Sequence, residues 1–465
     1  MKLHTTIGGC GLAVLAFACG REPERLSLDK VPAASRAPAA SSVLRFANEG
    51  GPARLYRVPS LEPSAWKAED KLPPVERVIG ADPEQGLVFT LDGKRNLVTL
   101  DLETRRVRTY LEQVRNAAMG PDGALYAIDT GSTVTQMVRR TPIRFRSKLQ
   151  GNPRQVYATM TGALLARVGD KAPVLEVLGS DQAPVSTTLP SEQMAASFYG
   201  DLIAVATDTG VILYQTQGKN APKSIRLSGH PKAVLFSPSG HRLYVAQEDD
   251  ELLILDRFSG EQLAAIDLPG PAKGLRGDRF GEWLLVQPAS GDSAWVIDVG
   301  HSRFGGTVSA RWASDLPAVA SPNALLVRRG ADVAALDLAQ KDFAEVGRVR
   351  DGAADEWLPI AWRPARDAES DVTTDSSALA TADSGKGGAS VYLQVSSSQN
   401  PVWASELADK LRAAGLPASV LAPTRSDEAH RVVLGPYATR EQAEETGRKI
   451  GMPSFIVSGQ DAPAR

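Results

Sequence analysis

Four closely spaced polar side chains near the C-terminal end of this 465-residue chain could hydrogen-bond a polar ligand: Gln394, Ser396, Ser397 and Asn400. Amide and hydroxyl groups each offer both a donor and an acceptor, so the set can satisfy the hydroxyl and amide groups of a ligand. Farther along, Arg431 would add charge-assisted donors and Tyr437 an aromatic ring. Taken alone, these residues fit a solvated strand surface equally well.

The surrounding pattern predicts the elements that must position them. Alternating apolar residues predict strands over 391–395, 417–421, 431–435 and 454–457. Apolar residues at helical spacing from Ala404 predict a helix that begins at Asn400-Pro401 and ends before Gly415. Thr439 and Gln442 form a capping box for a second helix through Lys449. If both helices cover one sheet face, the open face displays Tyr392, Gln394, Arg431 and Val433.

This β-α-β-β-α-β segment, 389–458, resembles the SPOR family of peptidoglycan-binding domains. The resemblance is carried, in order, by Val391-Tyr392-Leu393-Gln394-Val395-Ser396-Ser397, by Arg431-Val432-Val433-Leu434-Gly435-Pro436-Tyr437 and by Arg440-Glu441-Gln442-Ala443. Ser398 departs from the pattern, because a phenylalanine is common after the first strand.

SPOR domains recognise glycan strands stripped of their stem peptides, which accumulate at division septa. They use the open sheet face and the loop after the first strand. The resemblance therefore implies a glycan-binding site formed by Tyr392, Gln394, Ser396, Ser397, Asn400, Arg431, Val433 and Tyr437. An RNA-binding sheet has the same topology but needs stacked aromatic residues and basic surroundings. The formal net charge of −2 argues against a nucleic-acid partner.

The N-terminus follows the plan of an exported protein. Lys2 is followed by an apolar stretch, Ile7 to Ala18, which is shorter than the roughly 20 residues that span a bilayer. Residues 15–20 resemble a bacterial lipobox, which implies a signal peptide over 1–18 and lipidation at Cys19. Several acyl chains on one cysteine would give a stable membrane anchor. An ordinary secretory signal cut after Ala18 is the alternative.

Two segments have the composition of flexible tethers. Residues 19–42 and 366–388 are poor in large apolar groups and carry no apolar period. Residues 459–465 form a short tail.

Gly20 follows the lipobox cysteine in place of aspartate, which suggests an outer-membrane position facing the periplasm.

Between the tethers, residues 43–365 show short apolar alternations separated by Gly, Pro, Asp and Asn, which predicts strands joined by turns. One unit of four strands runs from Lys232 to Ile266, and its third strand ends in Asp256. Similar strands end in Asp101, Asp298 and Asp337. The repeat, near 40 residues, resembles the YVTN and WD-repeat type of β-propeller with about seven blades. A two-sheet sandwich is disfavoured, because it gives no reason for such a repeat. The recurring Asp is expected to cap a turn.

The chain offers little for catalysis, metals or cofactors. Its two cysteines, Cys10 and Cys19, lie in the leader, and its five histidines show no ligand spacing. No nucleophile–base pair and no phosphate-binding glycine loop are recognisable. We therefore expect no cofactor and no metal.

The sequence thus predicts a non-enzymatic envelope lipoprotein. Its SPOR-like domain would bind peptidoglycan, and its propeller would present a surface to an envelope protein that the sequence does not identify. Two alternatives remain open: an envelope glycan hydrolase or lyase with a SPOR targeting module, and an outer-membrane assembly factor.

Overall fold

The structure is a computed structural model, and it describes residues 42–362 and 391–458 apart from short gaps. The gaps are 83–84, 121–122, 139–140, 160–161, 170–172, 180–183, 198–199, 217–220, 239, 241, 258, 279–280, 322, 399–400, 414, 423–429, 439–441, 444–445 and 447–454. The predicted signal peptide, Cys19, the tether up to residue 41, the linker 366–388, Asn400 and the tail 459–465 lie outside the described residues.

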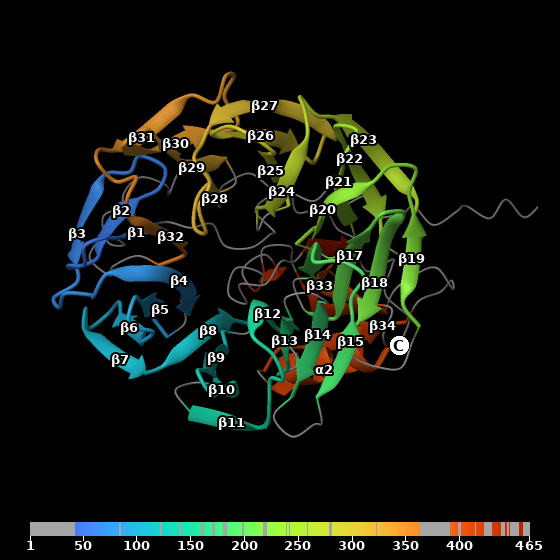
Figure 1. Cartoon of the computed structure of the whole chain (residues 1–465), viewed down its shortest axis with the longest axis horizontal. Helices are drawn as coiled ribbons and strands as arrows, with labels where there is room; N and C mark the ends of the chain where they lie inside the picture. Colours follow the sequence, from blue (N-terminus) through green and yellow to red (C-terminus); the bar gives the residue numbers. More distant parts are fainter. Residues whose placement is uncertain are drawn as a thin grey trace, which may run out of the picture.

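The middle region consists of eight four-stranded antiparallel sheets arranged in a ring (Figure 1). The first four blades along the ring are made of β32 (Glu356–Ile360) with β1 (Ser42–Phe46), β2 (Arg54–Arg57) and β3 (Pro63–Lys67); β4 (Val75–Asp82), β5 (Leu87–Asp92), β6 (Leu97–Asp101) and β7 (Val107–Leu111); β8 (Val114–Met119), β9 (Leu125–Asp129), β10 (Thr133–Val138) and β11 (Thr141–Lys148); and β12 (Pro153–Ala158), β13 (Leu164–Val168), β14 (Val174–Leu178) and β15 (Val185–Thr188).

The other four blades are made of β16 (Met194–Ala196), β17 (Leu202–Thr207), β18 (Gly210–Gln215) and β19 (Lys223–Arg226); β20 (Pro231–Phe236), β21 (Arg242–Gln247), β22 (Glu251–Asp256) and β23 (Gln262–Asp267); β24 (Ala272–Gly277), β25 (Trp283–Pro288), β26 (Ser293–Asp298) and β27 (Arg303–Ser309); and β28 (Ala318–Ser321), β29 (Ala324–Arg329), β30 (Asp332–Asp337) and β31 (Glu345–Val349). The predicted β-propeller is confirmed.

The ring has eight blades, one more than the approximate seven that the sequence suggested. Several blades give weak signals in the sequence. The third strands β10, β14 and β18 do not end in the Asp that marks other blades. The blade containing β32 is formed by strands from both ends of the region. No continuous stretch of sequence therefore shows its four strands together.

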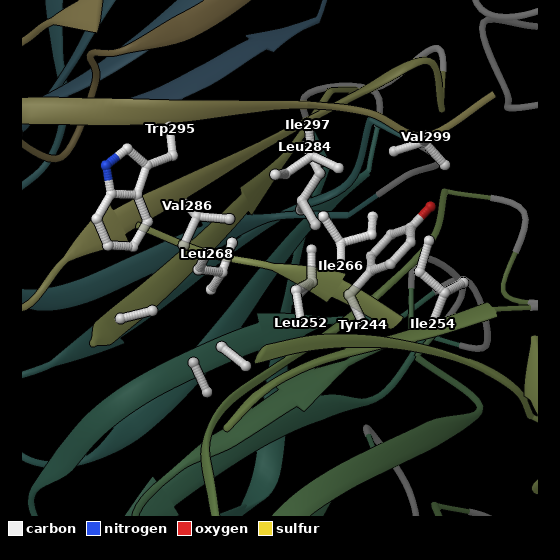
Figure 2. Close-up of a cluster of buried hydrophobic side chains, with 13 residues drawn as sticks. Tyr244, Leu252, Ile254, Ile266, Leu268, Leu284, Val286, Trp295, Ile297 and Val299 are labelled. Carbon is white, nitrogen blue, oxygen red and sulfur yellow. The ribbon is translucent and has the colours of Figure 1, made fainter. Parts of the chain in front are cut away.

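Apolar side chains fill the spaces between neighbouring blades. One cluster joins the β20–β23 blade to the β24–β27 blade, and Figure 2 shows Tyr244, Leu252 and Ile254 of the first blade gathered with Leu284 and Ile297 of the second. All of these side chains are at most 2% exposed. The middle strands of a blade have a neighbouring blade on each face, so their residues form near-continuous apolar runs, as in β5 and β21.

The recurring Asp caps the turn that follows the third strand, as predicted. The Asp101 carboxylate accepts hydrogen bonds from the backbone N–H groups of Glu103 and Thr104, at 3.1 and 2.8 Å. Equivalent bonds from a backbone N–H two or three residues ahead are made to Asp256, Asp298 and Asp337. The carboxylate thus satisfies donors that the tight turn leaves without partners.

Within the described residues, the C-terminal module is a four-stranded sheet with a helix packed on one face. Its strand order is β34 (Ala418–Leu421), β35 (His430–Tyr437), β33 (Val391–Ser398) and β36 (Phe455–Ser458), and its helix is α2 (Pro401–Ala413). The predicted helical face, including Leu407 and Leu411, packs on the sheet. Within the described residues, no helix has the length and apolar character needed to span a bilayer.

A buried ionic network lies where the ring closes. The Arg328 guanidinium makes two bonds to the Asp315 carboxylate, at 2.7 and 2.8 Å, and donates to the carbonyls of Ala353 and Asp355. Side chains of Arg328 and Asp315 are 3% and 4% exposed. Such a pair is favourable only because its remaining donors and acceptors are also bonded.

Two further acidic residues lie at the start of β32. Asp355 pairs with Arg45 of β1 and accepts the backbone N–H of Asn48. Burial raises the pKa of Glu356 to about 7, and the charge of Asp315 adds to that increase. Ionic contacts therefore link the first and last strands of the propeller to the preceding blade.

The network predicts that two arginine substitutions close together in the chain lower the free energy of unfolding by different amounts. Arg328→Ala should destabilise the propeller by about 3–5 kcal/mol, because it leaves the buried Asp315 carboxylate without its partner. Arg348→Ala is the control: Arg348 also pairs with acidic residues, Glu345 and Asp332, but its side chain is 47% exposed. Urea unfolding should show a large loss for the first variant and little change for the second. Equal midpoints for both variants would contradict the role assigned to the network.

Candidate functional site

The C-terminal sheet places its two faces in different environments. Leu393, Val395, Val432 and Leu434 point to α2, where they form a core with Leu407 and other residues of the helix. Residues that alternate with these on β33 and β35 lie on the other face. The alternation divides the sheet into the two sets of residues that the sequence predicted, one of them packed against α2.

The strand register brings four of the predicted site residues together on the open face. Gln394 lies opposite Val433, and Arg431 lies two residues from Val433 on the same strand. Tyr392 lies two residues from Gln394 on β33, so it shares that face. Arg431 is also the cross-strand partner of Ser397. The two central strands of the sheet thus assemble an amide, a guanidinium and an aromatic ring on one face.

The expectation that Gln394 and Val433 are displayed to solvent is wrong. Gln394 is 2% exposed and Val433 is fully buried. The two lie opposite each other on the central strands, with Cβ atoms about 4.5–5.5 Å apart, so each covers part of the other. The Gln394 Nε2 group has no hydrogen-bond partner. A buried donor without a partner is rare in folded proteins and is a common mark of a ligand or water position.

Ser396 lies apart from the open-face residues, contrary to expectation. The register shifts between Gln394 and Ser396, so that Val395 is the extra residue of a β-bulge and Ser396 lies opposite Val432. Since Val432 faces the helix, the bulge turns Ser396 toward the covered face, where it is 3% exposed. Its hydroxyl has no hydrogen-bond partner.

Tyr437 also differs from its expected position. It lies opposite Val391 and packs against the core beneath α2, and its buried hydroxyl has no hydrogen-bond partner. Of the two predicted aromatic contacts, the structure therefore places only Tyr392 on the open face. The difference follows from a register shift between Val391 and Leu393, and the glycine inside β35, Gly435, is the sequence signal that could have indicated it.

Besides Glu356, the described part of the propeller holds one acidic residue with a raised pKa, and sequence reasoning missed it. Burial raises the pKa of Asp278 to about 7, against the opposing effect of backbone N–H bonds from Gly281, Glu282 and Trp283. Those bonds cap the turn between β24 and β25, so its role in the structure is that of a turn residue. In the described part of the chain, no group of three or more metal-ligating side chains is found.

The family model of the SPOR domain matches residues 387–457. This segment is a SPOR domain. The match covers the sheet and helix described above, and a SPOR domain is a binding module for peptidoglycan. The SPOR sheet therefore carries the candidate site of this protein, and the resemblance seen in the sequence is confirmed.

The propeller is similar to that of several solved structures. Dihydro-heme d1 dehydrogenase NirN in complex with DHE is 15% identical, with 70% of this chain and 76% of that chain covered and a TM-score of 0.51. Apo AztD from Citrobacter koseri is 12% identical, with 68% and 96% covered and a TM-score of 0.48. At such identity the likeness to NirN shows the propeller fold alone. No curated protein matches the chain.

The unpaired amide of Gln394 leads to a stability prediction. Gln394→Met keeps the length of the side chain and removes a buried donor whose missing partner costs roughly 1–3 kcal/mol, so the SPOR domain should be as stable as wild type or more stable. Leu434→Ala on the neighbouring strand should instead cost about 2–5 kcal/mol, because it opens a cavity under α2. Thermal unfolding of both variants checks the contrast. A strongly destabilised Gln394→Met protein would show that the amide has a structural partner.

Proposed function

We propose that this protein is an exported, lipid-anchored envelope protein that binds glycan strands stripped of their stem peptides and presents its propeller to another envelope protein. The observation that carries the proposal is the SPOR domain, whose open sheet face gathers Tyr392, Gln394 and Arg431. The anchor is Cys19, and the binding of denuded strands places the protein at division septa.

The chemistry of the face suits a glycan. The free Nε2 group of Gln394 can donate to a hydroxyl or N-acetyl oxygen of a sugar, and the Arg431 guanidinium supplies charge-assisted donors. The Tyr392 ring offers a flat apolar surface for the less polar side of a sugar ring. A hydrogen bond to an uncharged group contributes roughly 0.5–1.5 kcal/mol, so several such contacts along a strand are needed for useful affinity.

The burial of Gln394 adds a condition to binding. At 2% exposure, its amide is reached only after side chains around it move. Binding therefore includes a local rearrangement of the sheet face, and part of the interaction free energy is spent on it. The ligand then meets a donor that no described protein group already occupies, which favours a specific hydrogen bond once the face has opened.

The glycan function is tested by sedimentation of the full-length protein with isolated sacculi, before and after amidase treatment that removes stem peptides. We expect amidase treatment to increase the bound fraction and Arg431→Ala to decrease it by about tenfold in affinity, as for the loss of a hydrogen bond from a charged group. Arg412→Ala, which changes an exposed residue of α2 paired with Asp409, is the matched control and should bind as wild type does. If the wild-type protein does not sediment with amidase-treated sacculi, this function is excluded.

The anchor is tested separately in cells. Cys19→Ser removes the thiol that would carry the acyl chains, so the protein should move from the membrane fraction to the soluble envelope fraction and lose acyl labelling. The Cys10→Ser variant, changed in the same leader but away from the cleavage point, is the control. Unchanged fractionation and labelling of Cys19→Ser would leave a secreted protein without a lipid anchor.

A further inference from the structure

Gly435 lies at the closest approach of β35 to β33. A Cβ atom placed on Gly435 would lie 3.0 Å from the carbonyl oxygen of Val391, 3.1 Å from Cδ1 of Tyr392 and 3.2 Å from the backbone nitrogen of Tyr437. Contacts this short are tighter than almost all that real Cβ atoms make. Any side chain at this position must therefore displace the strand or the Tyr392 ring.

The backbone at Gly435 has a second requirement for glycine. Its φ is +129°, in the region that residues with a side chain rarely adopt. The register also shifts here, because Val391 pairs with Tyr437 whereas Leu393 pairs with Leu434. Two residues of β35 thus face the single residue Tyr392, and the first of them has no side chain to compete for space with the ring.

We propose that Gly435 is a positioning residue for glycan binding, because its missing side chain lets the Tyr392 ring lie against β35 beside Gln394. The inference rests on the glycan function proposed above and deepens it. A Tyr392 ring that already packs against the backbone loses little conformational entropy when a sugar binds. More of the free energy of the contact then contributes to affinity. A Cβ at position 435 would push the ring away from that place.

The same chain offers a control for backbone strain alone. Gly415, which follows α2, also has a positive φ, +83°, but an added Cβ there would meet nothing within 4 Å. Gly415→Ala and Gly435→Ala both force alanine into an unfavourable backbone conformation. They differ in that only the second brings a new atom against Tyr392.

The test is a double-mutant cycle in the full-length protein, with affinity for amidase-treated sacculi and thermal unfolding as the two measurements. Gly435→Ala should weaken binding about tenfold in the wild-type background and less than about twofold when Tyr392→Leu is already present, since residues in contact are not additive. Its cost in stability should also be smaller beside Tyr392→Leu, because the clash between the new Cβ and the ring is then gone. Gly415→Ala should lower stability and leave affinity within about twofold of wild type.

Each outcome decides the inference. Equal losses of affinity in both backgrounds would show that Gly435 acts through the backbone alone, and would overturn the positioning role while the glycan function stands. A wild-type protein that does not bind the sacculi would remove both. If Gly435→Ala does not fold, Tyr392→Phe and Tyr392→Leu decide instead: Phe should bind as wild type does and Leu about tenfold more weakly, because only Phe keeps the ring. Equal binding by these two variants would also overturn the inference.

Discussion

The pairing of β1 with β32 is the contact on which the propeller depends. Five residues at the start of the described chain, Ser42–Phe46, pair antiparallel with five residues more than 300 positions later, Glu356–Ile360. Without this pairing the closing sheet would lose its innermost strand, and two neighbouring blades would lose an apolar face. Leu44 and Phe46 pack toward the β4–β7 blade, and Val43 packs toward the β28–β31 blade. The single pair of strands therefore completes both of its neighbouring interfaces.

The ionic network supports this closure at a point where apolar contacts alone are not specific. Arg328 donates hydrogen bonds to the carbonyl groups of Ala353 and Asp355, just before β32 begins. Within β32, the backbone N–H of Trp357 donates a hydrogen bond to the Asp315 carboxylate. These bonds fix which residue of β32 enters the sheet, since a slip of one residue would turn every side chain to the opposite face. These buried charges contribute more to the choice of register than to net stability. The free energy lost when they leave water offsets much of the free energy gained from their attraction.

Much of the fold can be predicted from the sequence, because local patterns determine it. The strand alternation, the Asp-capped turns and the helix ending before Gly415 each depend on residues within one turn or strand. The number of blades cannot be predicted in this way, because the closing blade joins Ser42–Phe46 to a strand at the far end of the region. In the site, the sharing of a face by Gln394 and Arg431 follows from alternation. The inward turn of Ser396 does not, because it follows from a one-residue bulge at Val395 that leaves no composition signal.

Ring closure also determines where the two flanking segments attach. In the register of β1 and β32, Ser42 lies directly opposite Ile360. The chain enters the propeller at one of these residues and leaves it at the other, so both connections start from the same end of the same strand pair. A membrane anchor before Ser42 and a glycan-bound SPOR domain after Ile360 would thus be joined through neighbouring strands, with the remaining seven blades outside the direct path between them. With the proposed anchor and glycan contacts both made, a load between them would enter the propeller through β1 and β32.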